Sequence, residues 1–205
     1  VRKGIGSLTI FDHDVVSISN LNRQFFRRRQ VGKNKALQLA YNLSRAGCGG
    51  STVSGVGRSF QRAVEEEQVP ETDLLICGVD NHETRSYVCR YAYKNSIPAL
   101  FTAVSRDGNN GYVFVQKPGG PCFVCSRPGG PNSDSDENGT CTPDPAIKDI
   151  LKLMGGLVLY AVDSLLTDRQ RSWNYREVFL AGFVSERNLN MEKSHDCPVC
   201  GTGSN

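Results

Sequence analysis

The chain lacks several features that would assign it to a common class of protein. It has no run of about 18 apolar residues, the length that a membrane-spanning helix needs, and no secretory signal opens it. Its net charge is only +3 and its aromatic content is 8%, which argues against a basic, aromatic surface for nucleic acid. We therefore expect a cytoplasmic globular protein that binds neither membranes nor nucleic acid.

The cysteines are the first positive signal. Eight of them would suit a secreted disulfide scaffold only in a much shorter chain, so we expect a reducing compartment. Four form two Cys-x-x-Cys pairs with turn-forming neighbours, the ligand pattern of a closed tetrahedral zinc site. Two redox dithiols or a disulfide framework are the alternatives. A four-thiolate zinc has no open position and would be structural. The four residues are Cys122, Cys125, Cys197 and Cys200.

Strand-like and helix-like segments alternate along the chain, which predicts an α/β fold with a Rossmann-like, mostly parallel sheet and helices on both faces. The segment 73–79 is apolar throughout, as expected for a central strand covered on both faces. Strands are expected at 7–11, 51–56, 73–79, 98–104, 111–116 and 177–184, and helices at 33–45, 61–68, 83–94 and 145–166.

Residues 118–140 differ from the rest of the chain because Pro, Gly, Ser and acidic residues dominate them. Such a composition cannot bury enough apolar surface to order itself. We expect a mobile loop attached to a zinc knuckle, within one domain that spans residues 1–205. The knuckle and loop occupy 117–145, and a second knuckle occupies 195–205.

Two carboxylates follow predicted strands, where ligands bind in open α/β sheets. Asp12 suits a ribose hydroxyl pair, and Asp80 suits Mg²⁺, which favours one or two carboxylates together with phosphate oxygens. Cations between them could hold a polyphosphate. The alternatives are a turn residue, a helix cap and a solvated basic face. The cations are Arg23, Arg27, Arg28, Arg29, Lys33 and Lys35.

Three motifs in a fixed order identify a family resemblance. Asp12-His13-Asp14 leads to the string Ser19-Asn20-Leu21-Asn22-Arg23-Gln24. The segments 31–36 (VGKNKA) and 79–85 (VDNHETR) follow. Together they resemble the ThiF/MoeB/HesA family, which includes the adenylation domains of ubiquitin-activating enzymes. The cysteine pairs fall where many members carry a structural zinc, so the resemblance covers nearly the whole chain.

The resemblance implies an ATP-dependent adenylyltransferase. Its substrate would be the C-terminal carboxylate of a ubiquitin-like or sulfur-carrier protein, and its products an acyl-adenylate and pyrophosphate. The resemblance assigns ATP ribose to Asp12 and Mg²⁺ to Asp80. Asn20, Arg23 and Lys35 would contact the phosphates, and Gln24 belongs to the motif with a less defined role. It also implies a homodimer or heterodimer.

Cys141 lies outside both pairs, where the family places a crossover loop before a long helix. In similar members a cysteine there serves in thioester or persulfide chemistry, so the resemblance implies a transfer step through Cys141. An exposed loop cysteine without a role is the alternative, since Asp136 and Glu137 would raise the pKa of its thiol.

One departure concerns the start of the chain. Family members have a Gly-rich phosphate loop and helix ahead of the strand that ends at Asp12, whereas this sequence begins at the turn into that strand. Gly4-Ile5-Gly6 precedes a strand and opens no helix, so it is not the dinucleotide fingerprint. We expect a partial chain that lacks the first β-α unit and binds ATP poorly.

Other functions remain open from the sequence alone. A non-catalytic family member that dimerises and recruits a partner would fit the missing loop. A nicotinamide dehydrogenase would fit Asp12, but no hydride-transfer residues accompany it, and a zinc-ribbon nucleic-acid binder would use Arg27, Arg28 and Arg29. The sequence names neither the protein substrate nor the fate of the activated carboxylate, whether sulfur transfer, conjugation or peptide modification.

Overall fold

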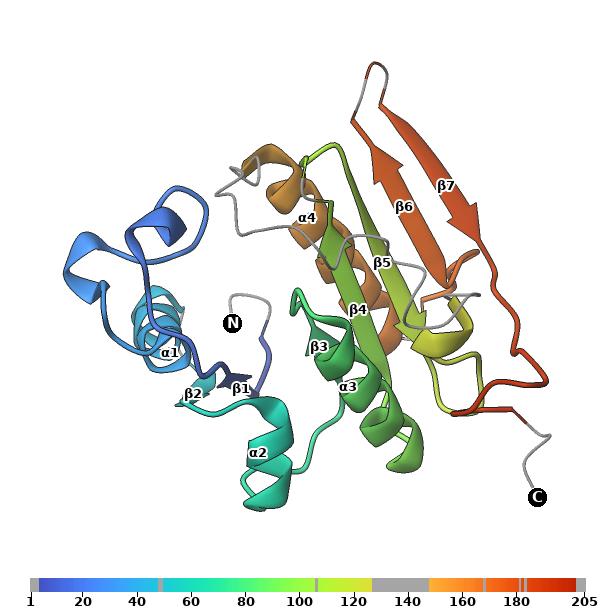
Figure 1. The fold of residues 1–205 in the computed structure, drawn as a ribbon, viewed down its shortest axis with the longest axis horizontal. Helices are drawn as coiled ribbons and strands as arrows, with labels where there is room; N and C mark the ends of the chain where they lie inside the picture. The colour runs from blue at the N-terminus through green and yellow to red at the C-terminus, as the bar shows by residue number, and fades with distance from the viewer. Residues whose placement is uncertain are drawn as a thin grey trace. The chain divides into compact units, whose positions relative to one another are not determined.

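The computed structural model describes residues 4–47, 50–105, 107–126, 148–167, 169–180, 182 and 184–201. The chain divides into two compact units, Val1–Glu71 and Thr72–Asn205, which are described separately below (Figure 1). No helix among the described residues combines the length and the apolar character that crossing a membrane requires. The assignment of residues 1–205 to one domain stays a prediction.

The first unit contains a parallel pair of strands, β1 (Ser7–Phe11) and β2 (Thr52–Val56), in which Ser7 is paired with Thr52. A helix, α1 (Lys35–Ala46), connects them, as a parallel pair requires. Two short 3₁₀ turns, η1 (Ile18–Asn20) and η2 (Arg28–Gln30), lie between β1 and α1. A second helix, α2 (Phe60–Glu65), follows β2.

Small residues bring α1 close to the strand pair. Ala36 and Ala40 are its buried positions, and Gly55 of β2 lies against its first turn. A Cβ atom built at Gly55 would stand 2.5 Å from the carbonyl oxygen of Ala36, so no other residue fits there without displacing the helix. Asn34 caps the helix, because its side chain accepts the N–H of Leu37 at 3.0 Å.

The second unit is a five-stranded sheet in the order β3-β4-β5-β6-β7. Strands β3 and β4 pair in parallel, and the remaining neighbours pair antiparallel. The strands are β3 (Leu75–Cys77), β4 (Ala99–Val104), β5 (Asn110–Gln116), β6 (Tyr175–Phe179) and β7 (Ser185–Leu189). The helices are α3 (His82–Lys94) and α4 (Lys148–Leu166), with a 3₁₀ turn, η3 (Phe123–Ser126).

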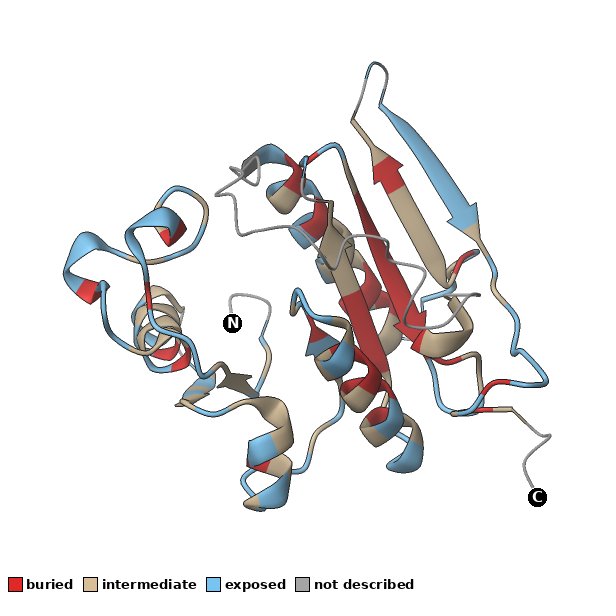
Figure 2. Cartoon of the chain, viewed as in Figure 1, coloured by how far each residue is buried: buried red, intermediate tan, exposed pale blue. Residues whose placement is uncertain are grey.

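The two helices cover opposite faces of this sheet (Figure 1). Because side chains alternate along a strand, Leu100 and Phe101 of β4 point to opposite faces. Leu100 joins Ile150 and Met154 of α4 in one core cluster. On the other face Phe101 stacks on Phe123 of η3, with ring centroids 4.5 Å apart. The buried residues of β4 and β5 therefore form the centre of the unit (Figure 2).

The α/β fold class and the helices on both faces are confirmed. The apolar stripe predicted for the long helix is the face of α4 that packs in the core cluster. The segment predicted as a covered central strand is different. The strand there is only Leu75–Cys77, and it is an edge strand of the five-stranded sheet. Its residue Ile76 is 51% exposed. The predicted mobile loop falls largely on residues 127–147, which lie outside the described residues.

Candidate functional site

Asp12 follows directly after β1 and is fixed through its backbone and its side chain. Its N–H donates to the Val56 carbonyl at 3.2 Å, and its own carbonyl accepts from Asn34 Nδ2 at 2.9 Å. Its Oδ1 accepts the backbone N–H of Asp14 at 2.9 Å. These bonds hold a partly buried carboxylate in one orientation at the end of a strand, where the sequence predicts a ribose contact.

Lys35 is the first residue of α1 and is held against the β1 strand end. Its Nζ donates to Asp14 Oδ2 at 2.8 Å, and its backbone N–H donates to the Asp14 carbonyl at 2.8 Å. The Lys35 side chain is only 18% exposed. The hydrogen bond from Lys35 is the main cause that holds the pKa of Asp14 below its ordinary value. A cation is thus held beside the Asp14 carboxylate, two residues from Asp12.

The loop 17–24 is built around the buried side chain of Asn20. Its Oδ1 accepts the Ser17 N–H at 2.9 Å, and its backbone carbonyl accepts the Gln24 N–H at 2.8 Å. Arg23 folds back on the same loop, because its Nη1 donates to the Ser19 carbonyl at 2.8 Å and to Asn22 Oδ1 at 3.1 Å. Asn20 therefore shapes the loop that carries Arg23, while Gln24 is exposed.

A buried amide network, which the sequence analysis did not find, anchors the basic stretch that follows. Gln30 is 3% exposed, and its Oε1 accepts the Arg27 N–H at 2.8 Å. Its Nε2 donates to Gln38 Oε1 at 3.0 Å and to Asn42 Oδ1 at 2.9 Å, both on α1. The network ties the loop to the same helix that carries Lys35. Its only sequence signal is a set of amides at separated positions, which no short motif reveals.

Asp80 lies in the second unit, three residues after β3, and is exposed. The segment beside it is firmly held. Asn81 caps α3 by accepting the Thr84 N–H at 2.8 Å, and the buried Arg85 donates to the Val79 carbonyl and, at 3.0 Å, to the hydroxyl of Tyr112. The strand end thus presents the Asp80 carboxylate to solvent on a fixed backbone. Such an arrangement suits a Mg²⁺ ion that keeps several water ligands.

The four predicted cysteines come together in the second unit, between η3 and the segment before residue 201. Their Sγ atoms all lie within 4.8 Å of one another. The Sγ atoms are 3.9 Å apart for Cys122 and Cys125, 3.4 Å for Cys122 and Cys197, and 3.2 Å for Cys125 and Cys200. Four thiolates around a zinc would be roughly 3.8 Å apart, given a Zn–S bond of about 2.3 Å. The cluster therefore fits a tetrahedral metal.

The surroundings of the cluster favour a closed structural site. Cys122 is fully buried, and Cys197 and Cys200 are buried. Burial raises the pKa of Cys197, but hydrogen bonds from the backbone N–H groups of Cys200 and Val199 hold that pKa down to about 7. The pKa of Cys122 is raised, mainly by the hydrogen bond with the Cys89 thiol and next by burial. A bound cation would favour the thiolate form of all four.

Gln116 connects this cluster to the sheet and to α3. The side chain is 1% exposed at the end of β5. Its Oε1 accepts the Phe123 N–H at 3.0 Å and faces the Cys89 thiol at 3.3 Å. Its Nε2 donates to the Cys89 carbonyl at 3.1 Å. One buried amide therefore fixes the turn that carries the first cysteine pair, and no sequence pattern pointed to it.

The predicted site residues are distributed over both units. Asp80 and the cysteine cluster belong to the second unit, and Cys141 lies outside the described residues. The remaining predicted nucleotide contacts belong to the first unit and are Asp12, Asn20, Arg23, Gln24 and Lys35.

Comparison with known proteins identifies the family. The model of the ThiF family matches residues 1–199. The SAMP-activating enzyme E1 of Haloferax volcanii is 30% identical over 98% of this chain and 73% of its own length. The adenylyltransferase and sulfurtransferase MOCS3 of Danio rerio is 29% identical over 97% of this chain, which covers 43% of MOCS3. The chain belongs to the ThiF family.

The solved structures agree on the fold. The crystal structure of E. coli MccB superposes with a TM-score of 0.80 at 19% identity, over 99% of this chain and 60% of MccB. At this identity the likeness concerns the fold alone. The chain thus spans most of the Haloferax protein but less than two thirds of MOCS3 and of MccB.

Proposed function

We propose that this member of the ThiF family uses ATP to adenylate the C-terminal carboxylate of a ubiquitin-like or sulfur-carrier protein. Two relatives that it matches over nearly its whole length are named as an E1 activating enzyme and as an adenylyltransferase and sulfurtransferase. In the reaction, a carboxylate oxygen forms a bond to the α-phosphorus of ATP. The bond between the α-phosphorus and the oxygen that bridges it to the β-phosphate breaks. The products are an acyl-adenylate and pyrophosphate.

The observation that carries this proposal is that hydrogen bonds hold two cations of the first unit, Lys35 at the β1 strand end and Arg23 on the loop 17–24. Lys35 is held beside Asp14, and Arg23 sits on a loop that the buried Asn20 shapes. Attack at a phosphate needs charge neutralisation and in-line positioning more than it needs a protein acid or base. Asp12 would hold the ribose, and Gln24 would belong to the nucleotide-binding loop 17–24 that carries Arg23. Asn20, Arg23 and Lys35 would contact the phosphates.

The second unit would supply the residues that bind the metal ions. Asp80 would be a ligand of Mg²⁺, and this cation balances the negative charge of a triphosphate. The cluster Cys122, Cys125, Cys197 and Cys200 would hold one structural zinc. A later transfer step through Cys141 is part of the proposal, as are a dimeric state and a cytoplasmic location.

Pyrophosphate exchange into ATP tests the reaction directly. The full-length gene product is incubated with each ubiquitin-like protein encoded nearby, and label from pyrophosphate should appear in ATP only when the correct partner is present. Asp80→Asn should abolish the exchange while leaving the circular dichroism spectrum unchanged, because replacing a carboxylate at a strand end opens no cavity in the core. Glu192→Gln changes an exposed carboxylate of the same unit and should exchange normally.

Three outcomes would count against the proposal. Full exchange by Asp80→Asn would remove the magnesium role from that residue. Absence of exchange with every partner, while the protein still binds one of them, would identify the non-catalytic scaffold instead. If Cys141→Ser still charges the partner and supports the downstream transfer, Cys141 is a bystander and this protein contributes the adenylation only.

A further inference from the structure

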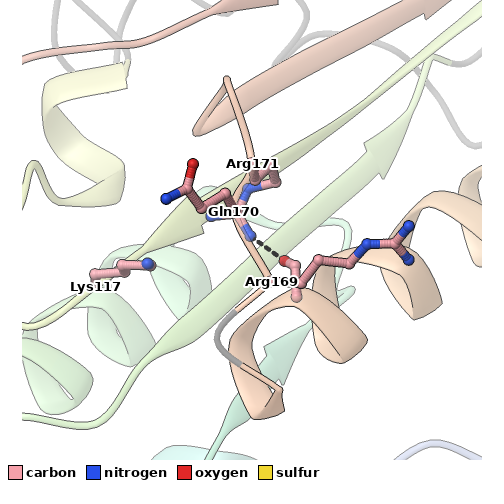
Figure 3. Close-up of a pocket in the computed structure, with 5 residues that line it drawn as sticks. Lys117, Arg169, Gln170 and Arg171 are labelled. Carbon is pink, nitrogen blue, oxygen red and sulfur yellow. Dashed lines mark hydrogen bonds between the residues drawn. The ribbon is translucent and has the colours of Figure 1, made fainter.

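A polar pocket of about 250 Å³ lies in the second unit, at the C-terminal end of α4 (Figure 3). It is lined by Lys117, just after β5, by Ser164 of α4, and by the segment Arg169, Gln170 and Arg171. Three of these five residues are cations, and none is a carboxylate. None of the residues that line it is among those assigned to adenylation or to the metals.

Arg171 is held in place by uncharged groups. Its Nε donates to the Trp173 carbonyl at 2.7 Å, and its Nη1 donates to the hydroxyl of Ser164 (Figure 3). That hydroxyl is buried and donates onward to the Ala161 carbonyl at 2.8 Å, so it acts as an acceptor for the guanidinium. Two of the five N–H donors of Arg171 are thus committed to neutral oxygens.

Two aromatic rings make cation–π contacts with the two arginines of the pocket. Tyr160 of α4 and Trp173 stack with centroids 6.3 Å apart. The Arg171 guanidinium lies over the Trp173 ring at 5.1 Å, and that of Arg169 lies over the Tyr160 ring at 5.7 Å. Aromatic faces orient guanidinium groups without neutralising their charge. The positive charge of the pocket is therefore preorganised and uncompensated by the residues that line it.

Burial of such a cation is costly. Desolvation lowers the pKa of Arg171, and within the described part of the chain no carboxylate forms an ion pair with it. Partly buried charges in proteins are ordinarily paired. An oxyanion that entered the pocket would provide the missing partner, and guanidinium groups match the geometry of phosphate and carboxylate oxygens.

We propose that the pocket formed by Lys117, Ser164, Arg169, Gln170 and Arg171 binds a small phosphate-bearing anion. Phosphate fits better than a single carboxylate, because three cations line the pocket and a carboxylate carries only one negative charge. The volume admits a phosphate or a diphosphate group. This site is independent of the proposed adenylation.

The chain contains its own reporter of binding. It has one tryptophan, Trp173, and Arg171 stacks on it. Titration of the full chain with pyrophosphate and with inorganic phosphate, at constant ionic strength set with chloride, should change the Trp173 fluorescence saturably. Pyrophosphate should bind more tightly than phosphate, and malonate, a dicarboxylate of similar size, more weakly than both. Constant ionic strength is necessary because salt screens exposed cations.

Variants of the pocket separate this site from others. Arg171→Gln should weaken pyrophosphate binding about tenfold or more, the effect of losing a charged hydrogen-bond donor. Lys117→Gln should weaken it less and leaves the fold intact, since Lys117 is exposed; it decides the matter if Arg171→Gln does not fold. Lys152→Gln, an exposed cation of α4 outside the pocket, and Lys35→Met in the first unit should leave the titration unchanged.

The proposal is overturned if neither phosphate species produces a saturable change. It is equally overturned if malonate binds more tightly than pyrophosphate, or if Lys117→Gln and Arg171→Gln both bind as the unaltered chain does. Loss of binding in Lys35→Met would place the anion at the nucleotide site instead. Pyrophosphate exchange into ATP by Lys117→Gln should stay normal, so failure of this proposal and failure of adenylation are distinguishable.

Discussion

The first unit has a core of small residues, whereas the second has large apolar side chains at its centre. Among the described residues, the buried apolar positions of the first unit are Val16, Ala36, Ala40 and Ala63, while those of the second include Leu100, Phe101, Phe114, Phe123 and Ile150. In the first unit the buried amides Asn20 and Gln30 shape the loops through hydrogen bonds. In the second, apolar packing and the cysteine cluster hold the elements together.

This difference suggests a division of labour. Hydrogen bonds to backbone groups fix the direction of a loop but contribute little net stability, roughly 1 kcal/mol each. Large buried side chains and a bound metal contribute several times more. We therefore expect substitutions in the first unit to alter ligand contacts more than folding, and substitutions at the centre of the second unit to do the reverse.

The largest expected effect follows removal of the metal from the second unit. Cys197→Ser should lower the free energy of unfolding by about 3 kcal/mol or more, because a structural zinc contributes its binding energy to folding. Elemental analysis should give one zinc for the unaltered chain and less for the variant. Cys77→Ser, a buried cysteine outside the cluster, should retain the metal. A metal-free chain with the same melting temperature would contradict the prediction.

In the first unit, loss of a positioned cation should affect catalysis and leave folding almost unchanged. Lys35→Met should slow pyrophosphate exchange roughly 30- to 1000-fold, which corresponds to about 2–4 kcal/mol of transition-state stabilisation. Arg23→Met should act similarly. Arg45→Met alters an exposed cation in the last turn of α1, at the opposite end of the helix from Lys35, and provides the control. If Lys35→Met and Arg23→Met are both silent, adenylation through this loop is excluded.

A smaller effect is expected from the amide network of the first unit. Gln30→Ala should cost about 1–3 kcal/mol of unfolding free energy, because it removes a buried amide that accepts the Arg27 N–H and donates to Gln38 and Asn42. Hydrogen exchange should show faster opening of η2 and the start of α1. Gln68→Ala, an exposed position in the same unit, should change neither. An unaltered exchange pattern in Gln30→Ala would show that the network is dispensable.

The smallest effect concerns pH and the pair Asp14–Lys35. The pKa of Asp14 is lowered in the folded chain, so its stabilisation is present above about 3.8, the ordinary value, and is lost as the pH falls through the lowered value. Because Asp14 is half-exposed, the contribution is only a few tenths of a kcal/mol, roughly that of a surface pair. Asp14→Asn should be slightly less stable at neutral pH and equal at pH values below the lowered pKa. A constant difference at all pH values would refute this origin.

Much of the fold was predictable because its signals are local. The strand at Ser7–Phe11 and the helix at His82–Lys94 follow from apolar periodicity and from polar residues at their ends. The cysteine cluster was predictable because Cys-x-x-Cys spacing encodes metal geometry within a few residues. The exposure of Ile76 was not predictable, since it depends on which strand becomes its neighbour.

The missed residues act between structural elements. Gln116 joins β5 to α3 and to the first cysteine turn, and Gln30 joins η2 to α1. An isolated glutamine has no spacing that identifies its partners before the chain is folded. The pocket around Arg171 was invisible for the same reason, because Lys117 and the end of α4 meet only in three dimensions.

The separation of the cysteine pairs also sets an order of events during synthesis. Cys122 and Cys125 contact thiols that lie 75 residues further along the chain. A ribosome must therefore release all of α4, β6 and β7 before the metal ligands can be completed. Folding during translation proceeds from the first residues onward. The nascent chain consequently carries the Cys122 and Cys125 thiols without their partners until the last pair arrives.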